Sequence, residues 1–338
     1  MKSLFLALLI FTGQVLAHNQ FDFNYYQADY IHGVKKLHIP GYPRAFNPSI
    51  ISYGDHYLLA FRDLATPGRP YNAIGVVLLD REFHLVGQPQ LIDMKSPLGR
   101  EVCHAEDPRL IRVGEKIMLL YTEYWRKQGL QHNEMRLTEL TVQNGKFCID
   151  PPKRLRAPYP FHHLPMQKNW VPFTFQDNLL FAYSIRPHRI LLYPSHADRC
   201  HQLMKTTSHF HWDFGKLRGG TPAQCVGDNY LAFFHSCSRG ASPYSDQQEM
   251  LHYFIGAYTF SGSPPFEIQK ISPKPIASYG MYHTPSFEDK VVVFPGGYVT
   301  DEESLYLVFG QNDEAIMVVK MDKEQLLNSL IPVDSDTH

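Results

Sequence analysis

The sequence has no excess of charge of either sign, because 32 Lys and Arg residues stand against 33 Asp and Glu residues, a formal net charge of -1. Charged residues make up 19 % of the chain, below the roughly 25 % usual for globular proteins. No run of basic residues occurs. Nucleic-acid-binding proteins need a basic face or stripe, so the composition argues against a nucleic acid as partner.

Cysteine is scarce and scattered, at positions Cys103, Cys148, Cys200, Cys225 and Cys237. No two of them form a C-x-x-C pair, so we expect no structural zinc site. Because the number is odd, at least one cysteine is free or pairs with another molecule. The sequence also lacks G-x-S-x-G, P-loop and H-E-x-x-H motifs, and we expect neither a metal nor a cofactor.

Long hydrophobic runs are missing apart from one at the N-terminus. Lys2 precedes the apolar run Leu4–Phe11, and Val15–Ala17 ends it with small residues spaced for signal peptidase. The run is shorter than the roughly 20 residues of a membrane-spanning helix, which disfavours the alternative of a transmembrane anchor. We therefore expect residues 1–17 to be a cleaved secretory signal. Residues 18–338 are then one domain with a polar C-terminal tail, secreted or periplasmic and without a membrane span.

Aromatic residues are abundant, with 22 Phe, 20 Tyr and 3 Trp, and hydrophobic residues make up 44 % of the chain. This composition can fill a sizeable core and excludes disorder of the whole chain. Trp125, Trp170 and Trp212 can stack on sugars, although core packing is the commoner use of tryptophan. The pairs His162–His163 and His209/His211 lack a third ligand, so we interpret them as structural or surface residues.

A repeated pattern organises the chain. Five times, a proline is followed by a short strand, a polar turn with Gly, Asp or Asn, and a second apolar strand, which is typical of a β-hairpin. These prolines are Pro48, Pro108, Pro172, Pro222 and Pro295.

Further strand candidates lie between the hairpins, so each repeat holds about four strands, as a propeller blade does. The pattern predicts an all-β chain, a five-bladed β-propeller, with one short helix around Lys323–Leu330. Two β-sandwiches are the alternative, and the fifth repeat is the least regular. The further strand candidates are Ala73–Leu79, Leu137–Val142, Ile190–Tyr193 and His252–Phe260.

The residue before each repeat proline is expected near the mouth of the central funnel, where convergent polar groups form a site. Asn47 and Asp107 hold two of these positions. A carboxyl group in a crowded funnel can have its pKa raised by burial, which suits a general acid, and Asp107 is the candidate. An equally weighted alternative is a salt bridge from Glu106 or Asp107 to Arg109.

Other polar residues flank the same hairpins. Arg62 and Asp63 end the first one, and the Arg62 fork can hold sugar hydroxyls or an anion; an ion pair between blades is the alternative. Lys216 and Arg218 precede Gly219–Gly220, where backbone can approach a ligand closely and cations attract phosphate. The alternative for this segment is a solvated turn.

With these residues in order, the chain resembles glycoside hydrolase family 130, the five-bladed β-propellers that act on β-mannosides, mostly by phosphorolysis. The resemblance covers nearly all of residues 18–338. The matching pieces are Asn47–Ser49, Phe61–Arg62, Glu106–Arg109, Tyr183–Pro187, Lys216–Pro222, Phe234–His235, Tyr253–Tyr258, Val291–Gly296 and Gly310–Asp313.

The resemblance implies a role for each matching position. Asp107 corresponds to the single catalytic acid, which protonates the glycosidic oxygen through a mannose hydroxyl. The implied sugar-binding residues are Asn47, Arg62, Asp63, His235 and Asp313, and the implied phosphate-binding residues are Lys216, Arg136 and Arg186. An oligosaccharide or glycan is then the substrate, and inorganic phosphate is a possible co-substrate.

Three reactions stay open at this point. In phosphorolysis, phosphate attacks the anomeric carbon with inversion and needs two or three cations to hold it. Hydrolysis needs a second carboxylate as base, for which Asp63 and Glu123 are candidates, and related transferases make mannosides. Export favours hydrolysis or transfer, because a sugar phosphate is hard to recover outside the cell, whereas Lys216 favours phosphorolysis.

Two other classes are alternatives. A catalytically silent propeller could bind glycans or a partner protein, although the presence of Asp107 with its neighbours favours an enzyme. Other five-bladed glycosidases place a carboxylate near the start of the first blade, where this chain has Asn47, and Asp22 upstream does not look like part of a first inner strand.

Overall fold

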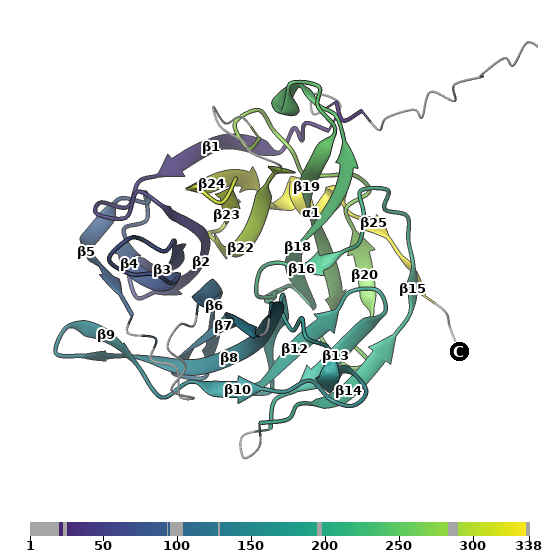
Figure 1. The fold of residues 1–338 in the computed structure, drawn as a ribbon. Coiled ribbons are helices and arrows are strands. Elements are labelled where there is room, and N and C mark those ends of the chain that lie inside the picture. Colours follow the sequence, from purple (N-terminus) through teal and green to yellow (C-terminus); the bar gives the residue numbers. More distant parts are fainter. Residues whose placement is uncertain are drawn as a thin grey trace, which may run out of the picture.

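The computed structural model shows strands almost throughout, arranged around a ring (Figure 1). The predicted signal at residues 1–17 and Cys103 lie outside the described residues. The described residues are 20–22, 26–92, 94, 104–127, 129–194, 198–282 and 290–335.

The first two sheets follow the chain from the inside of the ring outwards. One has the order β2-β3-β4-β5, and the next has the order β10-β8-β7-β6 with β9 paired to β8. The strands of the first are β2 (Ala45–Tyr53), β3 (His56–Asp63), β4 (Ala73–Leu79) and β5 (Leu85–Leu91). Those of the second are β6 (His104–Val113), β7 (Lys116–Lys127), β8 (Leu130–Gln143), β9 (Lys146–Ile149) and β10 (Lys153–Leu155).

The third sheet, β11-β12-β13-β14, follows a 3₁₀ turn at Phe161–His163, and a larger sheet comes next around the ring. The third sheet contains β11 (Val171–Phe175), β12 (Asn178–Ser184), β13 (His188–Leu192) and β14 (His201–Thr206). The larger sheet contains β16 (Arg218–Gly219), β17 (Gln224–Val226), β18 (Asn229–Gly240), β19 (Met250–Ser261), β20 (Ile268–Ile271), β21 (Lys290–Val291) and β25 (Ile331–Pro332). A second 3₁₀ turn, Pro243–Ser245, joins β18 to β19.

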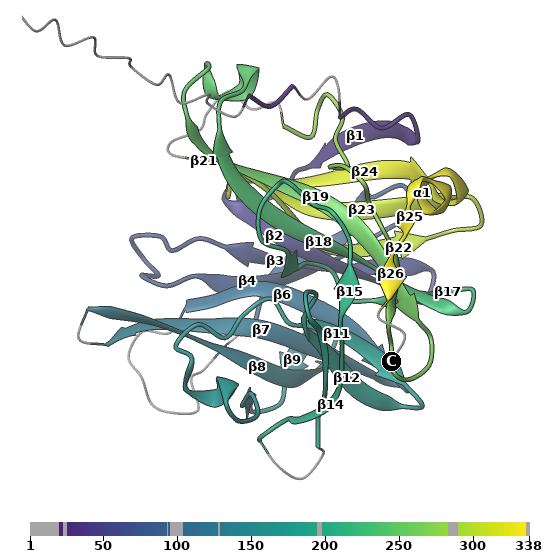
Figure 2. The ribbon, with the colours of Figure 1, turned by 90° about the vertical axis from the view of Figure 1, so that its right-hand side faces the viewer.

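The last sheet joins the two ends of the chain, because β1 (Ile31–Leu37) pairs antiparallel with β24 (Ala315–Asp322) in the order β1-β24-β23-β22. Its other strands are β22 (Val293–Thr300) and β23 (Ser304–Gln311). The predicted helix is confirmed as α1 (Lys323–Ser329), and Asp322 caps it by accepting from the amide of Gln325. Figure 2 shows α1 beside β24 and β25. A small sheet pairs β15 (Ser208–His209) with β26 (Asp334–Ser335).

Tight turns explain why the predicted hairpins form. Gln176–Asp177 and Asn144–Gly145 each connect two strands by two residues with positive φ, the geometry that matches the twist of paired strands. Four of the five repeat prolines lie inside a first strand, whereas Pro222 lies just before β17.

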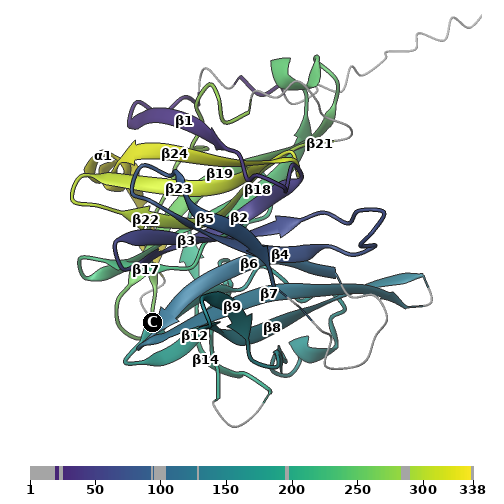
Figure 3. The same ribbon diagram turned by 90° about the vertical axis from the view of Figure 1, so that its left-hand side faces the viewer.

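Hydrophobic residues fill the spaces between neighbouring sheets. One cluster joins β2–β4 to β22–β24, a second joins β3–β4 to β6–β8, and a third joins β7–β8 to β12–β13. The largest joins β11–β13 to β18–β20 and on to β22–β24. Seen from the side, the sheets succeed one another as layers (Figure 3). Sheets packed face to face around a ring make this an all-β propeller.

The sheets are unequal in size, with four, five or seven strands in the larger ones. The sheets packed around the ring establish the propeller, whereas the predicted count of five blades is not confirmed. Within the described residues, no helix is long and apolar enough to cross a membrane.

Candidate active site

Two backbone irregularities create the site. Asn47 on β2 and Asp107 on β6 each precede a proline and have left-handed φ values of 44° and 52°. Both lie at a register shift, between Phe46 and Ser49 and between Glu106 and Arg109. Such bulges redirect a side chain out of the strand's alternation, and Asn and Asp tolerate this conformation better than other non-glycine residues.

The redirected side chains meet. Asn47 Nδ2 donates to Asp107 Oδ1 at 2.9 Å, and Arg62 Nη1 lies 3.4 Å from the same oxygen. Arg62 Nη2 also donates to Glu106 Oε1 at 2.7 Å, and Asn72 Nδ2 donates to that oxygen at 2.9 Å. The side chains of Arg62, Glu106 and Asp107 remain 13–16 % exposed, so a ligand can reach them.

The two adjacent carboxyl groups differ in acidity. Burial alone raises the pKa of Asp107, but Arg62, Arg109 and the hydrogen bond from Asn47 outweigh it, so this pKa lies below its ordinary value. Burial raises the pKa of Glu106, and Arg62 offsets this only in part. The expectation of a raised pKa at Asp107 is therefore wrong for the ligand-free protein, because Arg62, Arg109 and Asn47 together outweigh the effect of burial. The alternative of an ion pair from Arg62 to the neighbouring sheet is confirmed.

The guanidinium of Arg109 donates to backbone oxygens and not to the carboxylates of Glu106 and Asp107, with which a salt bridge was the alternative. It is 3 % exposed and donates to the backbone oxygens of Gly220, Asp107 and Pro108. Burial lowers the pKa of Arg109 to about 10. Its buried charge still acts on Asp107 while its hydrogen bonds tie β6 to the segment before β17.

His235 on β18 supplies a neutral group opposite these charges. It is 2 % exposed, and its ring stacks on Tyr253 at a centroid distance of 6.0 Å. Burial lowers the pKa of His235 to about 3, and Arg218 and Arg109 act in the same direction. The imidazole is thus uncharged at neutral pH and can donate or accept a hydrogen bond.

Three polar atoms of the cluster are buried and have no hydrogen-bond partner within the described part of the chain: Asn47 Oδ1, Arg62 Nε and His235 Nδ1. Buried polar groups are nearly always paired in folded proteins. Unpaired polar atoms around an accessible carboxylate mark this cluster as the candidate site for a polar ligand.

One of the two cations that act on the site, Lys168, was not predicted from the sequence, whereas Arg218 lies in the segment expected to attract phosphate. Lys168 acts electrostatically on Glu106, Asp107 and His235, and Arg218 acts on His235. Lys168 lies just before Asn169, which has a left-handed φ of 62° like Asn47 and Asp107. Its place ahead of the strand that carries Pro172 is the sequence signal that could have found it.

Asp313 lies near the same cluster but is held by another cation. Its Oδ2 accepts from Lys290 Nζ at 2.5 Å, and both residues act on the pKa of Tyr253. The position agrees with the predicted neighbourhood of His235, and the pairing with Lys290 was not foreseen.

Within the described part of the chain, no hydrogen bond or ion pair joins Asp107 to the remaining predicted residues. Asp63 pairs with Arg69, and burial raises its pKa although Arg69 and Arg44 oppose this. Lys216 is exposed, and the exposed Arg186 lies over the ring of Phe210 at 4.9 Å. Their assigned roles in binding remain predictions.

Arg136 is fully occupied within the protein. It is 2 % exposed and forms ion pairs with Glu123 and Glu134. This pairing uses both the predicted phosphate ligand Arg136 and the candidate base Glu123.

No group of three His, Cys, Asp or Glu side chains suited to a metal occurs among the described residues. Trp170 and Trp212 are 1 % and 9 % exposed and belong to the core, whereas Trp125 is partly exposed. Four cysteines are free, namely Cys148, Cys200, Cys225 and Cys237.

The fold and the site can now be compared with known proteins. A family model described as beta-1,4-mannooligosaccharide phosphorylase matches residues 42–331. The chain belongs to glycoside hydrolase family 130. As a member of family 130 it is a glycoside phosphorylase- or glycosidase-like enzyme. No curated protein matches the chain.

Solved structures share the fold. The beta-1,2-mannobiose phosphorylase of Listeria innocua has a TM-score of 0.58 at 14 % identity, over 88 % of this chain and 93 % of that one. MPT-4 of Leishmania mexicana, a mannose phosphorylase in complex with phosphate ion, gives 0.57 at 13 % identity, over 93 % and 94 %. MPT-1 of the same organism, a GDP-Man-dependent mannosyltransferase, gives 0.54 at 14 %, over 87 % and 91 %. At these identities the likeness shows the fold alone.

Proposed function

We propose that this family 130 enzyme cleaves β-linked mannosides by phosphorolysis, with Asp107 as the acid and inorganic phosphate as the nucleophile. The observation that carries the proposal is the set of cations around Asp107 and His235. Arg62 contacts Asp107 directly, Lys168 acts on both residues, and Arg218 acts on His235. Arginine and lysine are the side chains that hold phosphate in proteins.

The state of the candidate bases supports phosphate over water. An inverting hydrolase needs a carboxylate that can activate water on the face of the sugar opposite the acid. Glu123 is 3 % exposed and bound to Arg136, and Asp63 is 5 % exposed and bound to Arg69. Both candidate bases are thus buried and paired with a cation, which favours phosphate over an activated water.

In the proposed reaction, the bond from the anomeric carbon to the glycosidic oxygen breaks and a bond to a phosphate oxygen forms on the opposite face. The leaving oxygen takes the proton of Asp107 through a mannose hydroxyl, as the resemblance implies. The products are α-mannose 1-phosphate and the shortened glycan, and Asp107 is reprotonated from solvent. Asn47 and Arg62 position Asp107 and the sugar bound beside it, while His235 orients the reacting groups.

Phosphate binding also accounts for how Asp107 can act as an acid although its pKa is low in the free protein. The free protein favours the carboxylate, because Arg62, Arg109 and Lys168 stabilise its negative charge. A bound phosphate dianion brings a like charge to the same cations, and a like charge raises the pKa of a carboxyl group. We infer that the acid becomes protonated when phosphate is bound, so phosphate is required both as nucleophile and for the proton.

The wider organisation is part of the proposal. We infer five blades, one for each sheet of four or more strands, in a single domain of residues 18–338. We also infer that residues 1–17 direct export to a secreted or periplasmic location, and that the enzyme needs no cofactor besides phosphate.

A turnover assay tests the proposal. The chain without residues 1–17 is given β-mannosides, such as mannosyl-glucose and short mannan oligosaccharides, with and without inorganic phosphate. Mannose 1-phosphate that forms only with phosphate supports phosphorolysis, and Asp107→Asn must abolish it. Free mannose formed regardless of phosphate shows hydrolysis and refutes the proposal. The absence of both products, with glycan binding retained, shows a silent binding propeller.

A further inference from the structure

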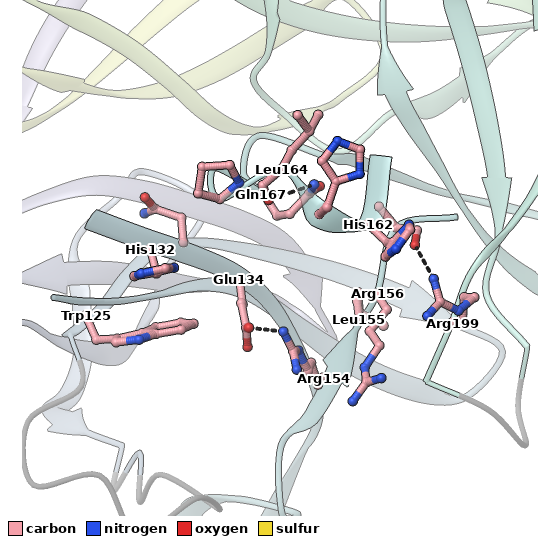
Figure 4. Close-up of a pocket in the computed structure, with 14 residues that line it drawn as sticks. Trp125, His132, Glu134, Arg154, Leu155, Arg156, His162, Leu164, Gln167 and Arg199 are labelled. Carbon is pink, nitrogen blue, oxygen red and sulfur yellow. Dashed lines mark hydrogen bonds and ion pairs between the residues drawn. The ribbon is translucent and has the colours of Figure 1, made fainter. Parts of the chain in front are cut away.

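A second polar pocket lies away from Asp107, on the sheet of β6–β10. Its volume is about 250 Å³, below the roughly 300–1,000 Å³ of sites for drug-sized ligands. The pocket therefore fits one small ring compound. Trp125 and His132 line it from one side, and Gln167 and His162 lie across from them (Figure 4).

The pocket offers a flat aromatic surface. Trp125 and His132 are direct partners on β7 and β8, and their rings stack at 5.4 Å with an angle of 12°. Leu164, 42 % exposed, lies on the rim. Aromatic rings with a polar tip bind ligands that have one apolar face and several polar groups, which describes a sugar ring.

The pocket also has an excess of positive charge. Arg154, Arg156 and Arg199 line it together with a single carboxylate, Glu134, a formal charge of +2 in a chain whose total is -1. Arg154 pairs with Glu134, and Arg156 pairs with Asp198, which is 48 % exposed.

Arg199 differs from the other two arginines. It donates to the backbone oxygen of Ala157 at 3.3 Å, and no carboxylate among the described residues pairs with it. A guanidinium fork matches the geometry of a carboxylate or a phosphate, so Arg199 can bind an anion without giving up an ion pair.

The pocket is connected to the active site by the sheet. Ala105, next to Glu106 on β6, pairs with Glu123 on β7. Glu123 in turn pairs with Glu134 on β8, which lines the pocket. Adjacent strands lie about 4.8 Å apart, so the two backbones are about 10 Å apart. From the other side, Gln167 lines the pocket and Lys168 acts on Asp107. A short oligosaccharide can cover this distance.

We propose that this pocket is a second carbohydrate-binding site for one sugar unit that carries a carboxylate or a phosphate ester. The aromatic pair contacts the ring of that sugar, and Arg199 binds its anionic group. That this acidic sugar is a distal unit of the glycan cleaved at Asp107 rests on the proposed function. The binding of an acidic sugar in the pocket is independent of the proposed function.

Titration calorimetry tests the site without turnover. The ligands are methyl glucuronide, mannose 6-phosphate, methyl mannoside and inorganic phosphate. We expect one or both acidic sugars to bind at least tenfold more tightly than methyl mannoside, and the stronger of the two identifies carboxylate or phosphate as the preferred anion. Equal binding of acidic and neutral sugars overturns the proposal, and so does equal binding of inorganic phosphate and mannose 6-phosphate.

Variants locate the binding. Arg199→Ala and Trp125→Ala are expected to weaken binding of the acidic sugar tenfold or more. Arg81→Ala, which removes an arginine in the turn between β4 and β5, should leave this binding unchanged. Lys168→Met is a control at the active site. If Lys168→Met abolishes binding while Arg199→Ala does not, the ligand sits at Asp107 and the second site is refuted. Thermal unfolding confirms that each variant is folded.

Discussion

Gly310 on β23 is the position where one added methyl group tests the geometry of the active site. A Cβ at Gly310 would lie 2.0 Å from Asn47 Oδ1 and 2.8 Å from Asn47 N. Real Cβ atoms do not approach that closely, so Gly310→Ala forces the Asn47 side chain out of its place. Gly33→Ala on β1 is the matched control, because nothing lies within 4 Å of its Cβ.

The magnitude follows from the contact that is lost. Asn47 donates to the Asp107 carboxylate at 2.9 Å, and a hydrogen bond to a charged group contributes about 1.5–3 kcal/mol. Loss of that contact in the transition state lowers kcat/KM by about 10- to 100-fold. Overpacking adds about 1–3 kcal/mol of destabilisation, seen as a lower Tm. Gly33→Ala should change neither kcat/KM nor Tm appreciably.

A double-mutant cycle separates the two effects. If Gly310 is needed because it leaves room for Asn47, Gly310→Ala should cost little further activity when Asn47 is already Ala, and the two losses should not add. The assay is mannose 1-phosphate formation at subsaturating mannoside. Additive losses, or a Gly310→Ala enzyme with kcat/KM within twofold of the parent, would refute the reasoning.

The other predictions concern charge. Lys168→Met should raise the KM for phosphate tenfold or more with a small effect on the KM for mannoside, and Lys205→Met on exposed β14 is the control; an unchanged phosphate KM contradicts the role of Lys168. Burial raises the pKa of Glu106, so its stabilising contribution is lost as pH rises through that pKa. Glu106→Gln should therefore raise Tm more at pH 7 than at pH 4, and a lower Tm at pH 7 argues against this. Burial lowers the pKa of His188 to about 4 and that of His235 to about 3, so the unfolded chain takes up protons first on acidification. The free energy of unfolding should fall as pH drops from about 7 towards these values, by at most about 1.4 kcal/mol per pH unit and site. His188→Gln should flatten this fall in acid titrations, and an unaltered slope would count against it.

The hairpins and the core of the site could be predicted because their signals are local. Turn residues such as Asn144–Gly145 specify where two strands connect, and the Pro motifs placed Asn47 and Asp107 at equivalent positions of adjacent sheets. In the structure, a hydrogen bond joins Asn47 to Asp107. The resemblance to family 130 pointed to the same residues, and the family match agrees with it.

The surroundings of Asp107 could not be predicted because they depend on which side chains cross from other sheets. Lys168 comes from the segment before β11, and its charge reaches Asp107 only when the ring is assembled. In the segment before β17, the expected cations Lys216 and Arg218 are both exposed, and Arg218, on β16, acts on His235. The direction of the pKa shift at Asp107 is a sum of burial and these distant charges, so no local pattern contains it.

The pairing of β1 with β24 has a consequence for synthesis on the ribosome. Leu37 pairs with Ile316, so β1 can pair only after another 279 residues have been synthesised. At roughly 5–20 residues per second, that delay is about 14–56 s. During this time β1 has no strand to pair with and the side of β2 that packs on β22–β24 is uncovered. An open strand edge is a template for pairing with other chains. The nascent chain therefore needs protection from aggregation until its last strands have been made.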